Sequence, residues 1–168
     1  MTTAQRRRMT PHHTRCEKLM DIIHATTIAT TPDRLYQALT TERGLAGWWT
    51  PDVTAEPRVG GVNEFRFGAV ARLSWRVDEL VPGRRVAWSS VDVPPEWTGT
   101  RLVFEIAPAG DRTDFRFTQT GLPDRYADYG CFAYLWGQYV RSLKLLLETG
   151  TGEPYGSPAS RAAGTTPA

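Results

Sequence analysis

The sequence predicts an α+β fold in which a curved antiparallel sheet wraps around one long C-terminal helix, with two short helices after the first strand. Two observations carry this prediction. Short segments rich in β-branched and aromatic residues follow one another between turn residues, and they precede a single long stretch with helical periodicity. Connections of a few residues suit antiparallel neighbours, because parallel strands need crossovers of a dozen residues or more. The 168 residues suffice for one domain.

The first expected elements are a strand and two short helices. Residues 21–30 are rich in β-branched types and are expected to form the strand. Thr31 can then cap a helix whose first position suits Pro32, and apolar residues recur at helical spacing through residues 34–39. A second short helix is expected over residues 42–47.

Alternation is the most informative pattern in the strands that follow. We expect these strands at residues 62–67, 70–80, 85–91, 100–106 and 113–120. One parity is apolar and collects Phe65, Phe67, Leu73, Trp75, Val77, Val86, Trp88, Leu102, Phe104, Ile106, Phe115 and Phe117. The other parity carries charges, including Glu64, Arg66, Arg72, Arg76, Asp78, Arg85, Arg101, Glu105, Asp114 and Arg116. This pattern is typical of a sheet that is covered on one face and solvated on the other.

The last element supplies the cover. Residues 125–148 contain no proline and carry apolar side chains at spacings of three and four, which predicts a long amphipathic helix that stops before Gly150. Packing so many bulky side chains between this helix and a curved sheet favours a cavity between the two.

The charges divide the chain into three parts. Residues 1–19 hold five of the twenty basic residues and one of the eighteen acidic ones, so residues 20–168 carry a formal charge of −2. We interpret residues 1–19 as a disordered basic extension, 20–155 as the domain and 156–168 as a disordered tail. This placement argues against nucleic acid and membrane surfaces as partners, although an Arg-rich extension that binds nucleic acid is the alternative interpretation.

Other features of the sequence favour a cytoplasmic protein without cofactor or metal. No window approaches a membrane-spanning length of apolar residues, and the first nineteen residues lack the apolar segment of a secretory signal. There are two cysteines, and Cys131 is expected to be a buried, inert thiol. Phosphate-loop, dinucleotide, hydrolase and zinc motifs are absent, and one histidine, His24, remains in the domain.

Several short segments resemble a known family when taken in order. They are IATTP at residues 28–32 with LYQALT at 35–40, GWW at 47–49, GG at 60–61, GLP at 121–123 and SLKLLLETGTGEP at 142–154. Over residues 21–155 the chain resembles the START-like (SRPBCC, helix-grip) superfamily, in particular the proteins similar to the activator of heat-shock-protein-90 ATPase. The resemblance implies the helix-grip fold. It leaves activity open, because this superfamily includes lipid and hormone carriers, polyketide cyclases, ring-hydroxylase subunits and co-chaperone domains.

The inward parity holds no carboxylate, arginine or lysine, which favours binding of a hydrophobic or aromatic small molecule over hydrolysis or redox chemistry. The residues expected to line the cavity are His24, Trp48, Trp49, Phe65, Trp75, Trp88, Phe104, Phe117, Gln119, Tyr129 and Trp136. Trp97 is expected on a loop, as an exposed contact or a gate. Two alternatives are a co-chaperone-like interaction module, with a chaperone or a second copy as partner, and a cyclase-like enzyme that uses His24 and Tyr134 for proton transfer.

Overall fold

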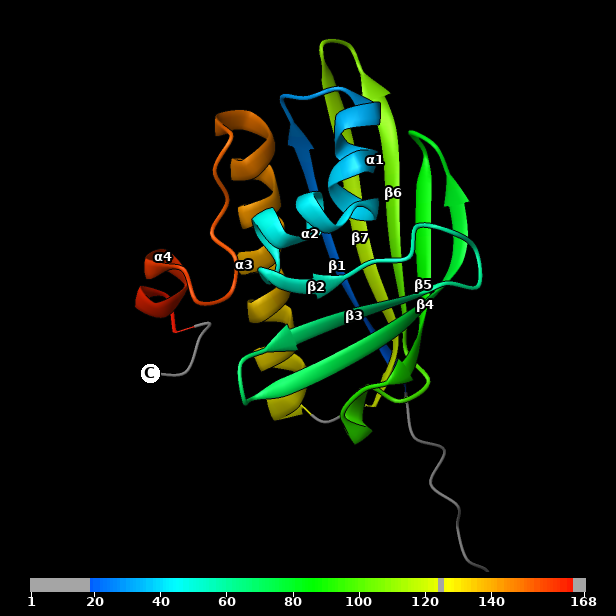
Figure 1. The fold of residues 1–168 in the computed structure, drawn as a ribbon, viewed down its shortest axis with the longest axis vertical. Coiled ribbons are helices and arrows are strands. Elements are labelled where there is room, and N and C mark those ends of the chain that lie inside the picture. The colour runs from blue at the N-terminus through cyan, green and yellow to red at the C-terminus, as the bar shows by residue number, and fades with distance from the viewer. Residues whose placement is uncertain (1–18, 124–125, 165–168) are drawn as a thin grey trace, which may run out of the picture.

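The computed structural model describes residues 19–123 and 126–164, and of residues 126–128 it describes the backbone alone. This part of the chain forms a seven-stranded antiparallel sheet with a long helix against one face (Figure 1). In chain order the elements are β1 (Leu19–Ile28), α1 (Pro32–Thr40), α2 (Glu42–Trp48), β2 (Asp52–Thr54), β3 (Val62–Phe67), β4 (Ala71–Val81), β5 (Arg85–Asp92), the 3-10 turn η1 (Pro95–Trp97), β6 (Arg101–Ala109), β7 (Arg112–Pro123), α3 (Tyr126–Thr149) and α4 (Pro158–Ala162). The expected fold class is confirmed.

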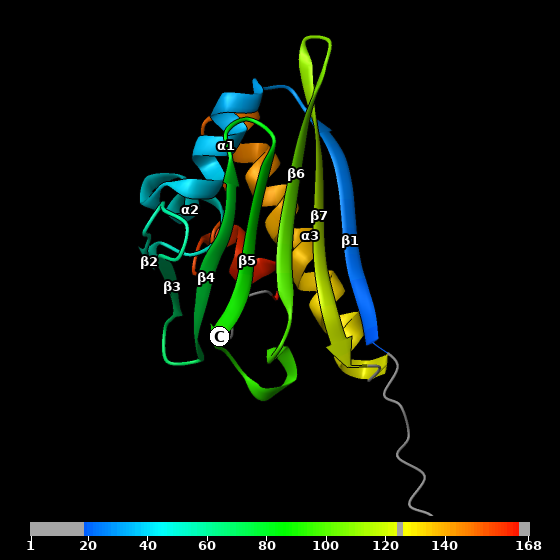
Figure 2. The same cartoon turned by 90° about the vertical axis from the view of Figure 1, so that its right-hand side faces the viewer.

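The sheet order is β1-β7-β6-β5-β4-β3-β2, so the first strand pairs with the last and the others follow as a meander. Helix α3 runs behind the sheet on the side that also carries α1 and α2 (Figure 2). The short elements β2 and η1 are not in the sequence prediction, because three residues are too few for a period to be recognised.

The predicted covered face is confirmed residue by residue. All twelve side chains of the apolar parity are buried, and the most exposed of them, Phe67, is 7% exposed. Arginine and carboxylate side chains of the other parity pair with each other on the opposite face. The core therefore lies between the aromatic face of the sheet and α3.

The helix ends follow the cap residues. The Thr31 hydroxyl accepts a hydrogen bond from the Arg34 amide at 3.3 Å, with Pro32 in the first turn of α1. Thr41 caps α2 in the same way, accepting from the Gly44 amide at 3.1 Å. Helix α3 ends just before Gly150, whose φ of +84° is a conformation that glycine adopts without strain.

Helix α3 packs closely against β1. A Cβ atom on Gly137 would lie 3.4 Å from Cε1 of His24, so a glycine here permits the close approach. Near the end of α3, Lys144 donates to Glu148 at 2.7 Å, and the Ala29 amide donates to the same carboxylate at 2.8 Å. The Lys144 hydrogen bond, with that of Ala29, lowers the pKa of Glu148.

The chain after α3 turns back along the helix, and we call residues 151–155 the C-terminal strap. Its Glu153 amide donates to the Ser142 hydroxyl at 2.7 Å, and its Tyr155 amide donates to the Trp49 carbonyl at 2.8 Å. These bonds tie the strap to α3 and to the residue that follows α2.

The expectation of a disordered tail from Gly156 is corrected for residues 156–164, which include α4. Ser157 caps this helix by accepting from the Ser160 amide at 3.1 Å, and Pro158 occupies its first turn. The Tyr134 hydroxyl of α3 donates to the Ala163 carbonyl at 2.9 Å. Composition suggested disorder, but the Ser-Pro pair is a local helix-start signal, and the contact with α3 holds the turn.

Residues 1–18, 124–125 and 165–168 lie outside the described residues, and with them the predicted basic extension, apart from Leu19, and the last four residues of the predicted tail. In the described ranges, no helix is both long enough and apolar enough to cross a membrane.

Candidate functional site: a cavity beside α3

A cavity of about 470 Å³ lies between the N-terminal half of α3, the β3–β4 hairpin, η1 and the C-terminal segment. This volume falls within the range of about 300–1,000 Å³ that is usual for small-molecule pockets. The exposed side chains of Val70 and Cys131 mark where the cavity reaches the surface. Its lining consists of Trp49, Phe67, Val70, Ala71, Leu73, Pro94, Glu96, Trp97, Cys131, Phe132, Leu135, Trp136, Tyr139, Tyr155 and Gly164.

Three tryptophans form the aromatic wall of the cavity. Trp49, which directly follows α2, lies with its ring centroid 5.1 Å from that of Trp136 on α3. Trp97 of η1 also stacks against Trp136, with 6.3 Å between the ring centroids. Trp49 and Trp136 were both in the predicted lining. Trp97 was expected on a loop as an exposed contact or a gate; it lies in the β5–β6 connection, half-buried, and packs into the wall.

Five other aromatic residues in the predicted lining are not among the residues that line the cavity and instead belong to the packed core: Trp48, Phe65, Trp88, Phe104 and Phe117. Several of them support the wall directly. Phe65 lies 4.1 Å from Trp49, and Phe117 lies 4.2 Å from Trp136, measured between ring centroids. Alternation identifies which side chains point inward, but not which of them border the empty space.

Trp75 is also buried behind the wall, 6.1 Å from Trp97 between ring centroids. The indole N–H groups of Trp75, Trp88 and Trp97 are buried and have no hydrogen-bond partner among the described residues. An unpaired buried donor costs about 1–3 kcal/mol, so each of these three N–H groups reduces the stability gained by burying its ring.

Gln119 is fully buried and fixes the central tryptophan. Its Oε1 accepts from the Trp136 indole at 2.7 Å, and its amide nitrogen donates to the Thr100 hydroxyl at 3.5 Å. Gln119 therefore orients the wall from behind rather than lining the cavity. Trp48 is fixed similarly, because its indole donates to the Ala38 carbonyl at 3.0 Å.

The groups considered for proton transfer do not line the cavity. His24 points inward as predicted, but its Nε2 lies 3.1 Å from the Ala133 carbonyl of α3, and its ring is 6.3 Å from Phe117. Tyr129 donates to the Asp21 carbonyl at 3.1 Å. Tyr134 is 52% exposed and bonds to the C-terminal segment described above. These groups join elements of the fold to each other.

The sequence prediction missed the tyrosines of the site. Tyr139 follows Phe132 and Trp136 at helical spacing, a signal that could have identified it. Tyr155 lies beyond the helix in a segment without periodicity. Cys131 corrects a further expectation, since its thiol is exposed at the cavity and not buried. It lies near the start of α3, next to Phe132 in the cavity lining.

The chemistry of the lining is apolar with two phenols. Burial, with a smaller contribution from neighbouring Tyr155, raises the pKa of Tyr139 well above its ordinary value. Its hydroxyl therefore stays protonated. Among the described residues, no three His, Cys, Asp or Glu side chains gather as a metal site would require.

A larger and more open hollow of about 1120 Å³ lies between α1, the β4–β5 turn and the β6–β7 hairpin. Its lining mixes arginines with carboxylates, and Arg85 pairs with Glu105 at 2.9 Å. Such self-paired charges are typical of a solvated surface. We therefore regard the smaller, aromatic cavity as the candidate site.

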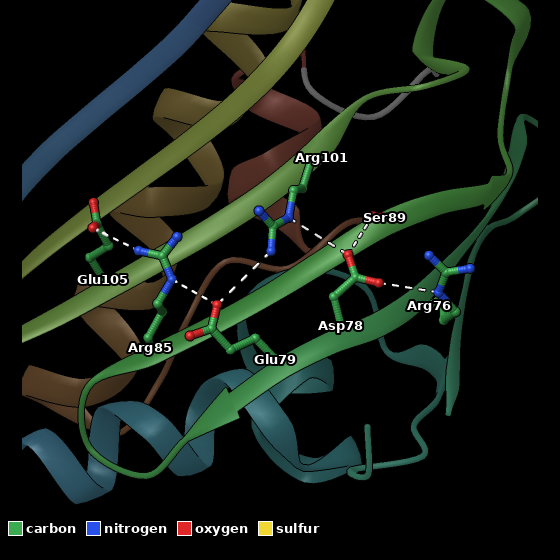
Figure 3. Close-up of polar contacts among 7 residues, drawn as sticks. All are labelled: Arg76, Asp78, Glu79, Arg85, Ser89, Arg101 and Glu105. Atoms are coloured by element: carbon green, nitrogen blue, oxygen red, sulfur yellow. Dashed lines mark hydrogen bonds and ion pairs between the residues drawn. The ribbon is translucent and has the colours of Figure 1, made fainter. Parts of the chain in front are cut away.

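The charged face of the sheet is likewise paired with itself (Figure 3). Asp78 accepts from Arg76 at 3.1 Å and from the Ser89 hydroxyl, and it lies 3.6 Å from Arg101. Arg85 bridges Glu79 and Glu105. Arginines engaged with neighbouring carboxylates offer little net positive potential to a phosphate backbone.

Comparison with known proteins identifies the family of the chain. The family model for the Activator of Hsp90 ATPase homolog 1-like protein matches residues 29–148. The solved Aha1 dimer from Colwellia psychrerythraea is 32% identical, with a TM-score of 0.74 over 79% of this chain and 99% of that one. CV1439 from Chromobacterium violaceum is 26% identical (TM-score 0.64; 77% and 98% covered), and MLL2253 from Mesorhizobium loti is 23% identical (TM-score 0.68; 76% and 96% covered). No curated protein matches significantly. The chain belongs to the family of Activator of Hsp90 ATPase homolog 1-like proteins.

Proposed function

We propose that this protein binds a hydrophobic or aromatic small molecule in the cavity beside α3. The observation that carries the proposal is a cavity of about 470 Å³ walled by the rings of Trp49, Trp97 and Trp136. Aromatic walls provide a large apolar contact area and stacking geometry for a flat ligand. A cavity of this kind is the usual form of a small-molecule site.

The placement of the polar groups also favours binding over catalysis. His24 and Tyr134, the groups of the cyclase-like alternative, bond to main-chain carbonyls and do not line the cavity. General acid or base catalysis needs a group within hydrogen-bond reach of the reacting atom.

The test uses the tryptophans of the wall as reporters. A panel of aromatic and lipid ligands is titrated into the purified protein while Trp fluorescence is followed, and saturable changes are expected for those that bind. Ala71→Phe should fill part of the cavity and weaken binding by about tenfold or more. Ala109→Phe, on the β6–β7 hairpin away from the cavity, is the matched control. No saturable change with any ligand would contradict the proposal.

A second candidate function is a protein-interaction role, which the family description favours. Stimulation of a heat-shock-protein-90 ATPase, with co-purification of the two proteins, tests this role directly. The relative from Colwellia psychrerythraea was solved as a dimer, so sedimentation analysis should also establish whether this chain self-associates. If Ala71→Phe removed ligand binding and left ATPase stimulation unchanged, the two roles would use different surfaces.

A further inference from the structure

Among the described residues, the cavity lining contains a negatively charged residue and no positively charged one. Of the fifteen lining residues, all of them described, one is charged, Glu96 of η1, and none is lysine, arginine or histidine. An anionic ligand would therefore lose its hydration without meeting a cation, and it would face a carboxylate as well. A cavity built to hold a fatty acid or another carboxylate would need a positive group at this surface.

The lining also offers hydroxyl donors without partners. Tyr139 is 8% exposed, lines the cavity, and has no hydrogen-bond partner for its hydroxyl among the described residues. Tyr155 lies next to it on the strap, and both rings pack against Phe67, at 6.4 and 5.3 Å between centroids. A tyrosine hydroxyl is protonated at neutral pH and can donate one hydrogen bond, and burial, which raises the pKa of Tyr139, favours this neutral form further.

The size of the cavity limits the ligand further. A cavity of about 150 Å³ in another protein holds one benzene molecule, so a volume roughly three times larger admits two or three fused rings. The three neighbouring tryptophan rings of the wall offer aromatic faces and edges against which a flat molecule can pack.

From these three features we infer that the cavity selects an uncharged, flat aromatic molecule bearing an oxygen acceptor, which receives the Tyr139 hydroxyl, and that it discriminates against carboxylates. The inference rests on the proposed ligand-binding function and specifies its ligand class. The acceptor oxygen would lie at the Tyr139 and Tyr155 end of the cavity. The ring system would then extend along the wall of Trp49, Trp136 and Trp97.

The test compares three probes that share one ring system. They are 2-acetylnaphthalene, with a neutral acceptor, 2-naphthoate, with a charged one, and 2-ethylnaphthalene, with none. Binding is measured by titration calorimetry at neutral pH with the full chain. We expect the ketone to bind about fivefold more tightly than the hydrocarbon, the effect of one hydrogen bond, and at least about tenfold more tightly than the carboxylate.

Single-residue variants test which side chains cause the affinity differences among the probes. Tyr139→Phe should weaken ketone binding about fivefold and leave hydrocarbon binding unchanged. Tyr129→Phe removes a hydroxyl from the same helix outside the cavity and should change neither. Glu96→Gln should improve naphthoate binding by about two- to threefold relative to the ketone, the size expected of a half-exposed charge.

The relative affinities of the three probes test the inference. Naphthoate binding as tightly as the ketone would overturn the inference and leave the proposed function standing. Equal affinity for ketone and hydrocarbon would overturn the assignment of the acceptor to Tyr139. Failure of all three probes to bind would overturn the inference, whereas the proposed function would be overturned only if the wider panel of aromatic and lipid ligands also failed to bind. The comparison of probes on the unmodified protein needs no variant, so it stands even if Tyr139→Phe does not fold.

Discussion

Gly152 is the position at which the C-terminal strap is most sensitive to substitution. A Cβ atom there would lie 2.2 Å from the Gly47 carbonyl oxygen and 3.1 Å from that of Ser142. Both are backbone atoms, so no side-chain rotation can relieve the contact. In Gly152→Ala the strap must therefore either stay in place under strain or lift away from α2 and α3.

The two responses cost similar amounts. Overpacking of this kind costs about 1–3 kcal/mol or more when backbone atoms cannot yield. Lifting the strap would break the hydrogen bonds from the amides of Glu153 and Tyr155, at about 0.5–1.5 kcal/mol each, and the ring contact of Tyr155 with Phe67, at about 0.5–1.5 kcal/mol. We expect Gly152→Ala to lower the free energy of unfolding by about 2–4 kcal/mol.

Urea unfolding followed by Trp fluorescence measures this loss. The matched control is Gly130→Ala on α3, where an added Cβ would meet nothing within 4 Å and should stabilise the helix by about 0.5–1 kcal/mol. Because Tyr155 lies on the strap, Gly152→Ala should also weaken binding of 2-acetylnaphthalene. A loss of less than about 1 kcal/mol in Gly152→Ala would refute the reasoning that the strap is held by close backbone packing.

Three further predictions test other parts of the structure. Trp136→Phe should lower the free energy of unfolding by about 2–3 kcal/mol, since it orphans the buried Oε1 of Gln119, and adding Gln119→Leu should restore part of the loss. Fully additive losses would contradict this coupling. The destabilisation by Glu148→Gln should be complete at neutral pH and should vanish as pH falls below about 4, because the folded state has the lower pKa. A destabilisation that does not change with pH would contradict it. In a Cys16→Ser background, Cys131 should react with a thiol reagent without denaturant, and saturating 2-acetylnaphthalene should slow the reaction. An unchanged rate would place the ligand elsewhere.

The fold was predictable because its signals are local and repeated. Alternation runs through most of the five strands, with irregularities in the pairing of β4, and a shift of one residue would place charges in the core. The inward set including Phe65, Trp88 and Phe117 could therefore be identified from parity. The caps at Thr31 and Gly150 gave the helix ends for the same local reasons.

The cavity was less predictable because it depends on packing in three dimensions. Strand parity places Trp88 inward and helical spacing places Trp136 inward, but Trp88 is surrounded by other rings, whereas Trp136 borders empty space. Trp97 and Tyr155 lie in segments too short to show a period, so no sequence signal located them. His24 was predicted to point inward and does, but the nearness of α3 makes it part of the packing.

The position of the cavity follows from how α3 crosses the sheet. At β1 the helix is close, with His24 bonded to Ala133, whereas the β3–β4 hairpin is joined to the helix by other segments, η1 on one side and the strap with Gly164 on the other. The family match ends at residue 148, so Tyr155 and Gly164 lie outside it. Tyr139, the proposed hydroxyl donor, lies on α3 within the match, whereas the strap supplies Tyr155. Replacing residues 151–155 by the corresponding segment of a relative should therefore change the affinity for 2-acetylnaphthalene through the contacts of Tyr155, while the fold and the Tyr139 donor stay in place.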